Sequence, residues 1–255
     1  MLFNKFPIEV GPPRKIVNNI KEYLDYINLY NGKRKAIYKS VYMCDIINNK
    51  AEYSNIIVDK IFFDFDDKSC NAHEECKKLH LELLKENLKH IIIMSGRGYH
   101  LHLFCVPLSS KNPKSLIYNI HHHFIDKLNL KCDNQIIGNP AQLARVPNTY
   151  NIKGKRFCIP LTKEQFEKED EFIKHLALKQ NFIKNISIGE KLLDLKRFYY
   201  KSERIEKLKF DTEFEDSVNQ DYMNNCDEKI KKLLLKKNLG WKERYLIILY
   251  FREKG

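Results

Sequence analysis

Hydrophobic residues in the first two thirds of the chain alternate between strand-like and helix-like spacing. Residues 56–66 contain a nearly continuous apolar block, which is typical of a central strand covered on both faces. Two more apolar runs, 90–94 and 99–106, are separated by Gly96-Arg97-Gly98, and this pattern predicts a hairpin. Helical spacing of apolar positions occurs at 14–29, 71–88 and 116–130. Mixed helices and neighbouring strands predict an α+β fold with a largely antiparallel sheet.

The other segments suggest how the chain is divided. Short strands are expected at 36–43 and 156–160, and a mostly helical, basic stretch is expected at 162–200. Residues 211–221 hold five acids and no bases, and two amphipathic helices follow at 230–235 and 245–251. We therefore predict a domain of residues 1–210, an acidic linker of residues 211–222 and a C-terminal helical region of residues 223–255.

Charge and cysteine content narrow the class of protein. The chain of 255 residues has 45 Lys and Arg against 33 Asp and Glu, so its formal charge is +12. This excess favours anionic partners, although a composition that merely makes the surface basic fits equally well. No apolar run is long enough to cross a membrane, and no secretory signal is visible. Seven cysteines, an odd number in mostly apolar surroundings, predict reduced core thiols and a cytoplasmic protein.

Two acids end the predicted central strand. In Phe63-Asp64-Phe65-Asp66-Asp67, the side chains of Asp64 and Asp66 share one face because strand residues alternate. Two carboxylates this close repel one another, and a bound Mg²⁺ or Mn²⁺ ion would remove that repulsion. A strand that simply runs out into solvent with a charged end is the simpler alternative.

Two further segments carry polar chemistry. Ser95-Gly96-Arg97-Gly98 could form an anion site with His100, because glycines let the backbone approach a ligand closely. Downstream, Asp133 is followed by Arg145-Val146-Pro147 and then by Asn151 and Lys153. An acid followed by basic residues suits a metal-bound nucleotide. An ordinary hairpin turn and a solvated basic loop are the alternatives.

Together, these three segments resemble the archaeo-eukaryotic primase superfamily, specifically the small catalytic subunit of archaeal DNA primase. Their order and spacing agree with the family over about residues 56–165. The resemblance implies a primase-type catalytic core and a DNA primase that makes short primers de novo on single-stranded DNA from NTPs or dNTPs. In that family Asp64, Asp66 and Asp133 would be the catalytic residues and would hold two Mg²⁺ or Mn²⁺ ions. The nucleotide-binding residues would be Ser95, Arg97, His100, Arg145, Asn151 and Lys153.

Relatives of this kind often have a four-ligand zinc knuckle after the paired aspartates. The candidate ligands here are Cys70, His73 and Cys76, with His80 as a fourth. Three of them also fall at helical spacing, so we favour structural helix residues and leave zinc open. The consecutive histidines 121–123 are expected at the surface or in a groove.

Residues from Cys226 onward resemble the start of the C-terminal domain of the primase large subunit, through Cys226, Gly240 and Arg244. This resemblance implies that Arg244 binds the initiating nucleotide and that the chain is a single-chain primase. An iron–sulfur cluster needs four cysteines, so none is expected within residues 1–255, where this region holds only Cys226. A helical hairpin packed on the catalytic domain fits the pattern equally well.

The expected partners are single-stranded DNA and NTPs or dNTPs, with a primase large subunit or a replication helicase or polymerase as further candidates, and no membrane. Two other functions stay open. One is a primase-polymerase or repair polymerase that mainly extends existing ends. The other is a non-catalytic nucleic-acid-binding replication protein. A metal-dependent nuclease is disfavoured because it has no need of the Arg- and Lys-rich segments.

Overall fold

The computed structural model describes residues 6–33, 36–67 and 70–199, all of which belong to one compact unit. The predicted linker 211–222 and the C-terminal region 223–255, with Cys226 and Arg244, lie outside the described residues. The described fold mixes helices with antiparallel sheets, so the predicted α+β class is confirmed. No helix in this part of the chain is long and apolar enough to span a bilayer.

The central sheet has four strands in the order β12-β7-β8-β6. They are β6 (Ile56–Asp66), β7 (His90–Met94), β8 (Gly98–Ser110) and β12 (Ile159–Leu161). Every pairing between them is antiparallel, and β7 and β8 form the predicted hairpin. Strand β6 lies against β8 along its whole length, with a register shift between Val58 and Lys60. This pairing places the end of β6 beside the hairpin turn.

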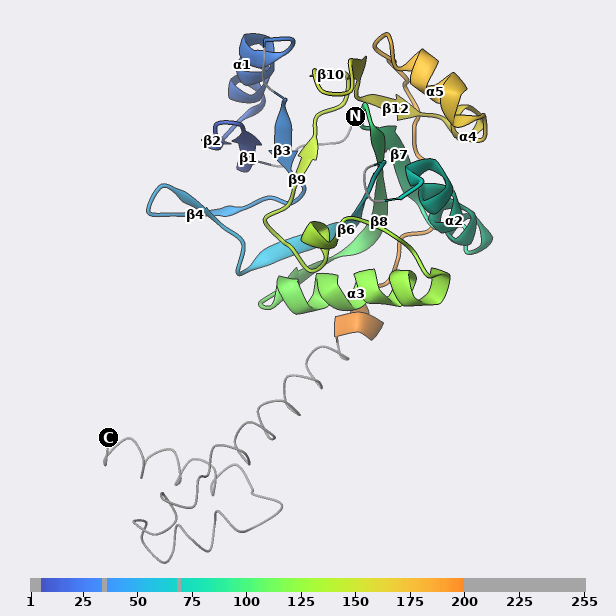
Figure 1. The fold of residues 1–255 in the computed structure, drawn as a ribbon. Helices are drawn as coiled ribbons and strands as arrows, with labels where there is room; N and C mark the ends of the chain where they lie inside the picture. Colours follow the sequence, from blue (N-terminus) through green and yellow to red (C-terminus); the bar gives the residue numbers. More distant parts are fainter. Residues whose placement is uncertain (1–5, 34–35, 68–69, 200–255) are drawn as a thin grey trace, which may run out of the picture. The chain divides into compact units, whose positions relative to one another are not determined.

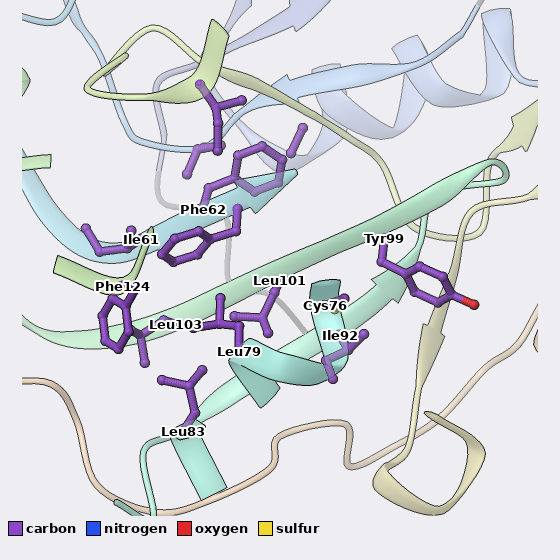
Figure 2. Close-up of a cluster of buried hydrophobic side chains, with 14 of the residues drawn as sticks. Ile61, Phe62, Cys76, Leu79, Leu83, Ile92, Tyr99, Leu101, Leu103 and Phe124 are labelled. Atoms are coloured by element: carbon purple, nitrogen blue, oxygen red, sulfur yellow. The ribbon is translucent and has the colours of Figure 1, made fainter. Parts of the chain in front are cut away.

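Two helices cover one face of this sheet (Figure 1). They are α2 (Ala72–Lys85) and α3 (Pro113–Leu128). Odd-numbered residues of β6, such as Phe63 and Phe65, are fully buried on this side. Figure 2 shows Leu101 of β8 close to Leu79 of α2, within the same hydrophobic cluster. Burial of each such side chain contributes roughly 1.5–3 kcal/mol, so this face fixes which residues of β6 must point the other way.

A second sheet, of the order β2-β1-β3-β9, supplies the region that faces the even-numbered residues of β6. Its strands are β1 (Ile8–Gly11), β2 (Lys15–Val17), β3 (Tyr38–Ser40) and β9 (Leu143–Arg145). Pairing of β3 with β9 puts Tyr38 opposite Arg145. The remaining short elements are β4 (Asp45–Ile47), β5 (Lys50–Glu52), the 3₁₀ helix η1 (Asn134–Ile136), β10 (Tyr150–Asn151) and β11 (Arg156–Phe157).

The predicted helix over 14–29 is only partly right. Residues Lys15–Val17 form strand β2, and the helix α1 spans Ile20–Tyr30. The apolar positions whose spacing predicts this helix, among them Ile20 and Leu24, do not form its buried face, because those two side chains are about half exposed. The buried side chains are Tyr23 and Tyr26, so the helix packs through aromatic residues that the aliphatic pattern overlooked.

The expectation of a mostly helical stretch over 162–200 is wrong. In its described part only α4 (Lys163–Phe166), α5 (Asp170–Leu176) and residues 196–199 are helical. After α5 the chain is extended along the central sheet, where Ile188 pairs with His90 through two backbone hydrogen bonds of 2.8 Å. Gly189 has a left-handed φ of +73°, and a Cβ there would collide with the backbone of Leu88. Sheet pairing therefore replaces the expected helix.

Candidate active site

The paired aspartates lie on the face of β6 away from the helices. Phe63 and Phe65 fill the helix-covered core, and strand alternation turns Asp64 and Asp66 to the opposite side. Across the sheet, Asp64 is paired with His100 and Asp66 with Gly98. The carboxylates are only partly exposed, 23% for Asp64 and 33% for Asp66. They are therefore not a strand end running out into solvent.

The structure brings Asp133 to the same strand. Its backbone N–H donates to the carbonyl oxygen of Asp64 at 2.9 Å, although 69 residues separate the two. The Asp133 side chain accepts a hydrogen bond from the backbone N–H of Gln135 at 2.9 Å and caps η1. Residue 133 is thus anchored beside the acidic end of β6 by its own backbone, and its role as a metal ligand stays a prediction.

The three acids influence each other electrostatically. Burial, followed by the charges of Asp133 and Asp66, raises the pKa of Asp64 to about 7, against the opposing pull of Arg145 and Arg97. A raised pKa of this kind means that the nearby positive charges do not fully compensate the ionised carboxylate. Oxygen-only donors of this type suit Mg²⁺ or Mn²⁺, so the residues present fit a divalent cation.

The side chains are not arranged around an ion in this structure. In the described ranges, no group of three His, Cys, Asp or Glu side chains lies close enough together to hold a metal. Asp66 instead pairs with Arg97, with Nη2 and Oδ2 3.2 Å apart, and Asp133 caps its own helix. Cation binding would require these carboxylates to exchange those partners for the ion.

The segment after β7 forms a tight turn next to the acids. The N–H of Ser95 donates to the carbonyl of Gly98 at 2.8 Å, and the N–H of Gly98 donates to Ser95 Oγ at 3.3 Å. Gly96 has φ +99°, and a Cβ there would lie 2.6 Å from Asn151. Glycine is needed at this position for both reasons. The turn directs Arg97 back toward Asp66.

Asn151 holds this turn against a second one. Its Nδ2 donates to the carbonyl of Ser95 at 2.9 Å, and its Oδ1 accepts from the N–H of Gly154 at 3.2 Å. The side chain is buried, and these contacts give it a positioning role between the two turns. Lys153, in the same turn, is exposed. The role of Asn151 as a nucleotide ligand stays a prediction, whereas the hydrogen bonds by which it joins the two turns are present in the structure.

Arg145 and His100 are buried side chains near the acids, and the charge of Arg145 lowers the pKa of Asp64. Arg145 Nη2 donates to the hydroxyl of Tyr38 at 2.7 Å, and the guanidinium lies over the Tyr38 ring. His100 Nε2 lies 3.7 Å from Asp64 Oδ1. Burial, and then the charge of Arg145, lowers the pKa of His100 to about 3, so the ring is neutral near pH 7. Among the described residues, Arg145 Nη1 and His100 Nδ1 have no hydrogen-bond partner.

The candidate zinc ligands do not converge. His73 Nε2 contacts the carbonyl oxygen of Phe166 at 3.3 Å, and His80 Nδ1 lies 2.8 Å from His90 Nε2. Cys76 is fully buried among the residues of the hydrophobic core, and Cys70 Sγ is 3.7 Å from the carbonyl oxygen of Asp66. These contacts agree with structural helix residues rather than with a zinc knuckle.

The expectation for the three consecutive histidines is wrong for the first. His121 is buried, and its Nε2 lies 2.9 Å from the carbonyl oxygen of Phe62. Helix α3 packs on the sheet through this residue, because the side chains at 120, 121 and 124 share the inner face. His122 and His123 are both partly exposed.

Three residues near the site were not anticipated from the sequence: Tyr38, Lys39 and Lys60. The first two lie on β3, whose pairing with β9 could not be read from the sequence. Lys60 does carry a signal, because it shares the strand face of Asp64 by alternation.

Comparison with known proteins leaves the family open. No protein-family model and no curated protein matches the chain. Among solved structures, the polymerase domain of Mycobacterium tuberculosis Ligase D in complex with DNA is similar at 12% sequence identity, with a TM-score of 0.37. The match covers 66% of this chain and 60% of that chain. At this level the similarity carries no argument about chemistry.

Proposed function

We propose that this protein catalyses metal-dependent nucleotidyl transfer and acts as a DNA primase. One observation carries the proposal: the backbone N–H of Asp133 donates to the backbone carbonyl of Asp64, and Asp64 and Asp66 share a strand face directly beside the Ser95–Gly98 turn. Nucleotidyl transfer needs acidic side chains that bind divalent cations and, next to them, basic groups that bind the phosphates of the nucleotide. A protein that only binds nucleic acid has no use for three adjoining acids.

In this proposal the three aspartates hold two divalent cations. Those ions, Mg²⁺ or Mn²⁺, would neutralise charge on the attacking 3′-hydroxyl and on the leaving pyrophosphate. Arg97 and the Ser95 hydroxyl hold the triphosphate, with Lys153 reaching it from the neighbouring turn. His100 is neutral, so it donates or accepts one hydrogen bond without adding charge.

The basic groups near the acids also neutralise part of the acidic charge before substrate binds. Arg97 partly neutralises Asp66 at 3.2 Å. Substrate phosphates compete for the same guanidinium, so triphosphate binding would free Asp66 to take a cation. Nucleotide and metal are therefore expected to bind cooperatively.

The test is synthesis on single-stranded DNA with NTPs or dNTPs and Mg²⁺ or Mn²⁺, without a primer. Labelled dinucleotides and longer products are expected. The matched control is Asp66→Asn, which keeps the size of the side chain and removes its charge, and which should abolish the products. Products only when a primer is supplied would favour a polymerase that extends ends. Nucleic-acid binding with no synthesis in either assay would contradict nucleotidyl transfer.

A further inference from the structure

A cavity lies between the second sheet and the open face of the central sheet. It has a volume of about 40 Å³, room for roughly three water-sized atoms. Besides Ser40 and Tyr42, five charged or imidazole side chains line it, and they come from four strands. These lining residues are Lys39, Asp59, Lys60, His102 and Arg145.

Two buried nitrogen atoms belong to the residues that line this cavity. His102 is 4% exposed and Arg145 is 7% exposed. Within the described part of the chain, neither His102 Nδ1 nor Arg145 Nη1 has a hydrogen-bond partner. Leaving such a polar atom unsatisfied costs about 1–3 kcal/mol, and more for a charged group. Arg145 Nη1 can only donate, so it requires an acceptor atom.

The charges around the cavity also favour an anion. Lys60 and Arg145 are cationic, and Asp59 is the one carboxylate among the lining residues. Asp59 pairs with Lys60, with Oδ1 and Nζ 2.7 Å apart, so it offsets the charge of Lys60 and leaves that of Arg145. Burial, and then repulsion from Lys60, lowers the pKa of Lys39 to about 7, and an anion beside it would favour its protonated form. A water molecule would satisfy the two nitrogens but would leave this excess charge in place.

The position of the cavity relative to the acids indicates which anion fits. Phe62 is paired with His102 and Asp64 with His100, so His102 lies two residues along β8 from the residue that faces Asp64. Lys60 is four residues from Asp64 on the same strand, or about 13 Å at ~3.3 Å per residue. Along the strands, the cavity lies on the side of Asp64 that is farther from the Ser95–Gly98 turn. It suits a phosphate on a neighbouring nucleotide better than one within the triphosphate held at the turn.

We propose that this cavity is a phosphate-binding subsite, separate from the Ser95–Gly98 turn, that receives a backbone phosphate of the nucleic-acid strand. The assignment to a strand rests on the proposed function, whereas the affinity for a phosphate group rests on the cavity alone. Arg145 and His102 donate to the phosphate oxygens, and Lys39 and Lys60 balance the charge. The subsite would fix the strand relative to the aspartates.

The test measures binding, so it does not depend on catalysis. Lys39→Gln and Lys60→Gln are each compared with the wild type for binding a labelled single-stranded oligonucleotide and, separately, a nucleoside triphosphate. Each substitution should weaken oligonucleotide binding about tenfold and leave triphosphate affinity unchanged. The slope of the logarithm of the oligonucleotide binding constant against the logarithm of salt concentration should fall by about one. The double variant Lys111→Gln/Lys114→Gln, at the start of the helix on the opposite face of the sheet, is the control and should bind as the wild type does.

The two binding measurements distinguish a phosphate of the nucleic-acid strand from a phosphate of the nucleoside triphosphate. Loss of triphosphate binding alone would overturn the strand assignment and give the subsite to the nucleotide. Unchanged affinity for both ligands would overturn the subsite. If Asp66→Asn and the wild type both fail to synthesise while the lysine variants still lose oligonucleotide binding, the proposed function fails and the subsite stands.

A second measurement uses the unaltered protein. Lys39, with its pKa near 7, should react quickly with an amine-acylating reagent, and mass spectrometry can follow that reaction. Saturating oligonucleotide should slow acylation of Lys39 and leave Lys114 unaffected. Equal acylation of Lys39 with and without oligonucleotide would contradict the proposal even if the variants did not fold.

Discussion

Replacing Asp64 with Asn should stabilise the protein at neutral and higher pH while abolishing synthesis. The pKa of Asp64 is about 7 in the folded chain and 3.8 as a model value, so folded protein binds more protons than unfolded protein between those values. Stability therefore falls as pH rises from about 4 to 7, and the loss is complete above pH 7. Three pKa units correspond to roughly 4 kcal/mol at the upper limit. The amide of Asn avoids this cost because it does not ionise.

The assay is urea denaturation of both proteins from pH 4 to pH 8 in the presence of a chelator. Asp64→Asn should be more stable than the wild type by up to about 4 kcal/mol at pH 8, and the two curves should converge near pH 4. Added Mn²⁺ should stabilise the wild type alone, because an ion that binds only the folded state shifts the unfolding equilibrium.

The control is Asp126→Asn, whose carboxylate is 74% exposed and should change stability by less than about 0.5 kcal/mol. An advantage of Asp64→Asn that is the same at pH 4 and pH 8 would refute the reasoning. So would the lack of any advantage at pH 8, since the electrostatic strain at the acidic cluster would then be absent.

Three other predictions concern the turn and the C-terminal region. Gly96→Ala should destabilise the fold by about 2–3 kcal/mol in urea denaturation, because it combines a left-handed φ with a collision against Asn151. Gly32→Ala, with φ +77° and open space around it, should cost only about 1 kcal/mol, and equal losses would contradict the clash. Arg97→Lys should raise the KM for nucleotide about tenfold with kcat less affected, because lysine lacks the bidentate fork; an unchanged KM would contradict phosphate binding by this residue. Removal of residues 222–255 should reduce primer initiation far more than extension, and equal loss of both would reject an initiation role.

The central part of the fold was predictable because its signals are local and strong. Strand β6 and the β7–β8 hairpin follow from an apolar block and from glycines at the turn, and their bounds lie within a few residues of the predicted ones. The prediction that residues 56–66 form a central strand is wrong, because β6 lies at the edge of its sheet. Burial of Phe63 and Phe65 then fixes the direction of Asp64 and Asp66. The pairing of acids on one face needed no information beyond strand alternation.

Features that depend on distant parts of the chain were not predictable. Helix α1 buries Tyr23 and Tyr26 because strands elsewhere supply a surface for aromatic rings, and the aliphatic spacing alone gave the wrong face. The chain around Ile188 has residues compatible with a helix, but the backbone of His90 offers better hydrogen bonds. Lys39 reaches the site only through the pairing of β3 with β9, which joins residues more than 100 positions apart.

The most direct test of the central claim is a count of Mn²⁺ ions bound at the aspartates, measured by electron paramagnetic resonance in the presence of a nucleoside triphosphate. The account predicts two ions per chain in the wild type, and loss of at least one of them in Asp133→Asn as well as in Asp64→Asn and Asp66→Asn. Undiminished binding in Asp133→Asn would contradict it, because residue 133 would then have no part in holding the ions.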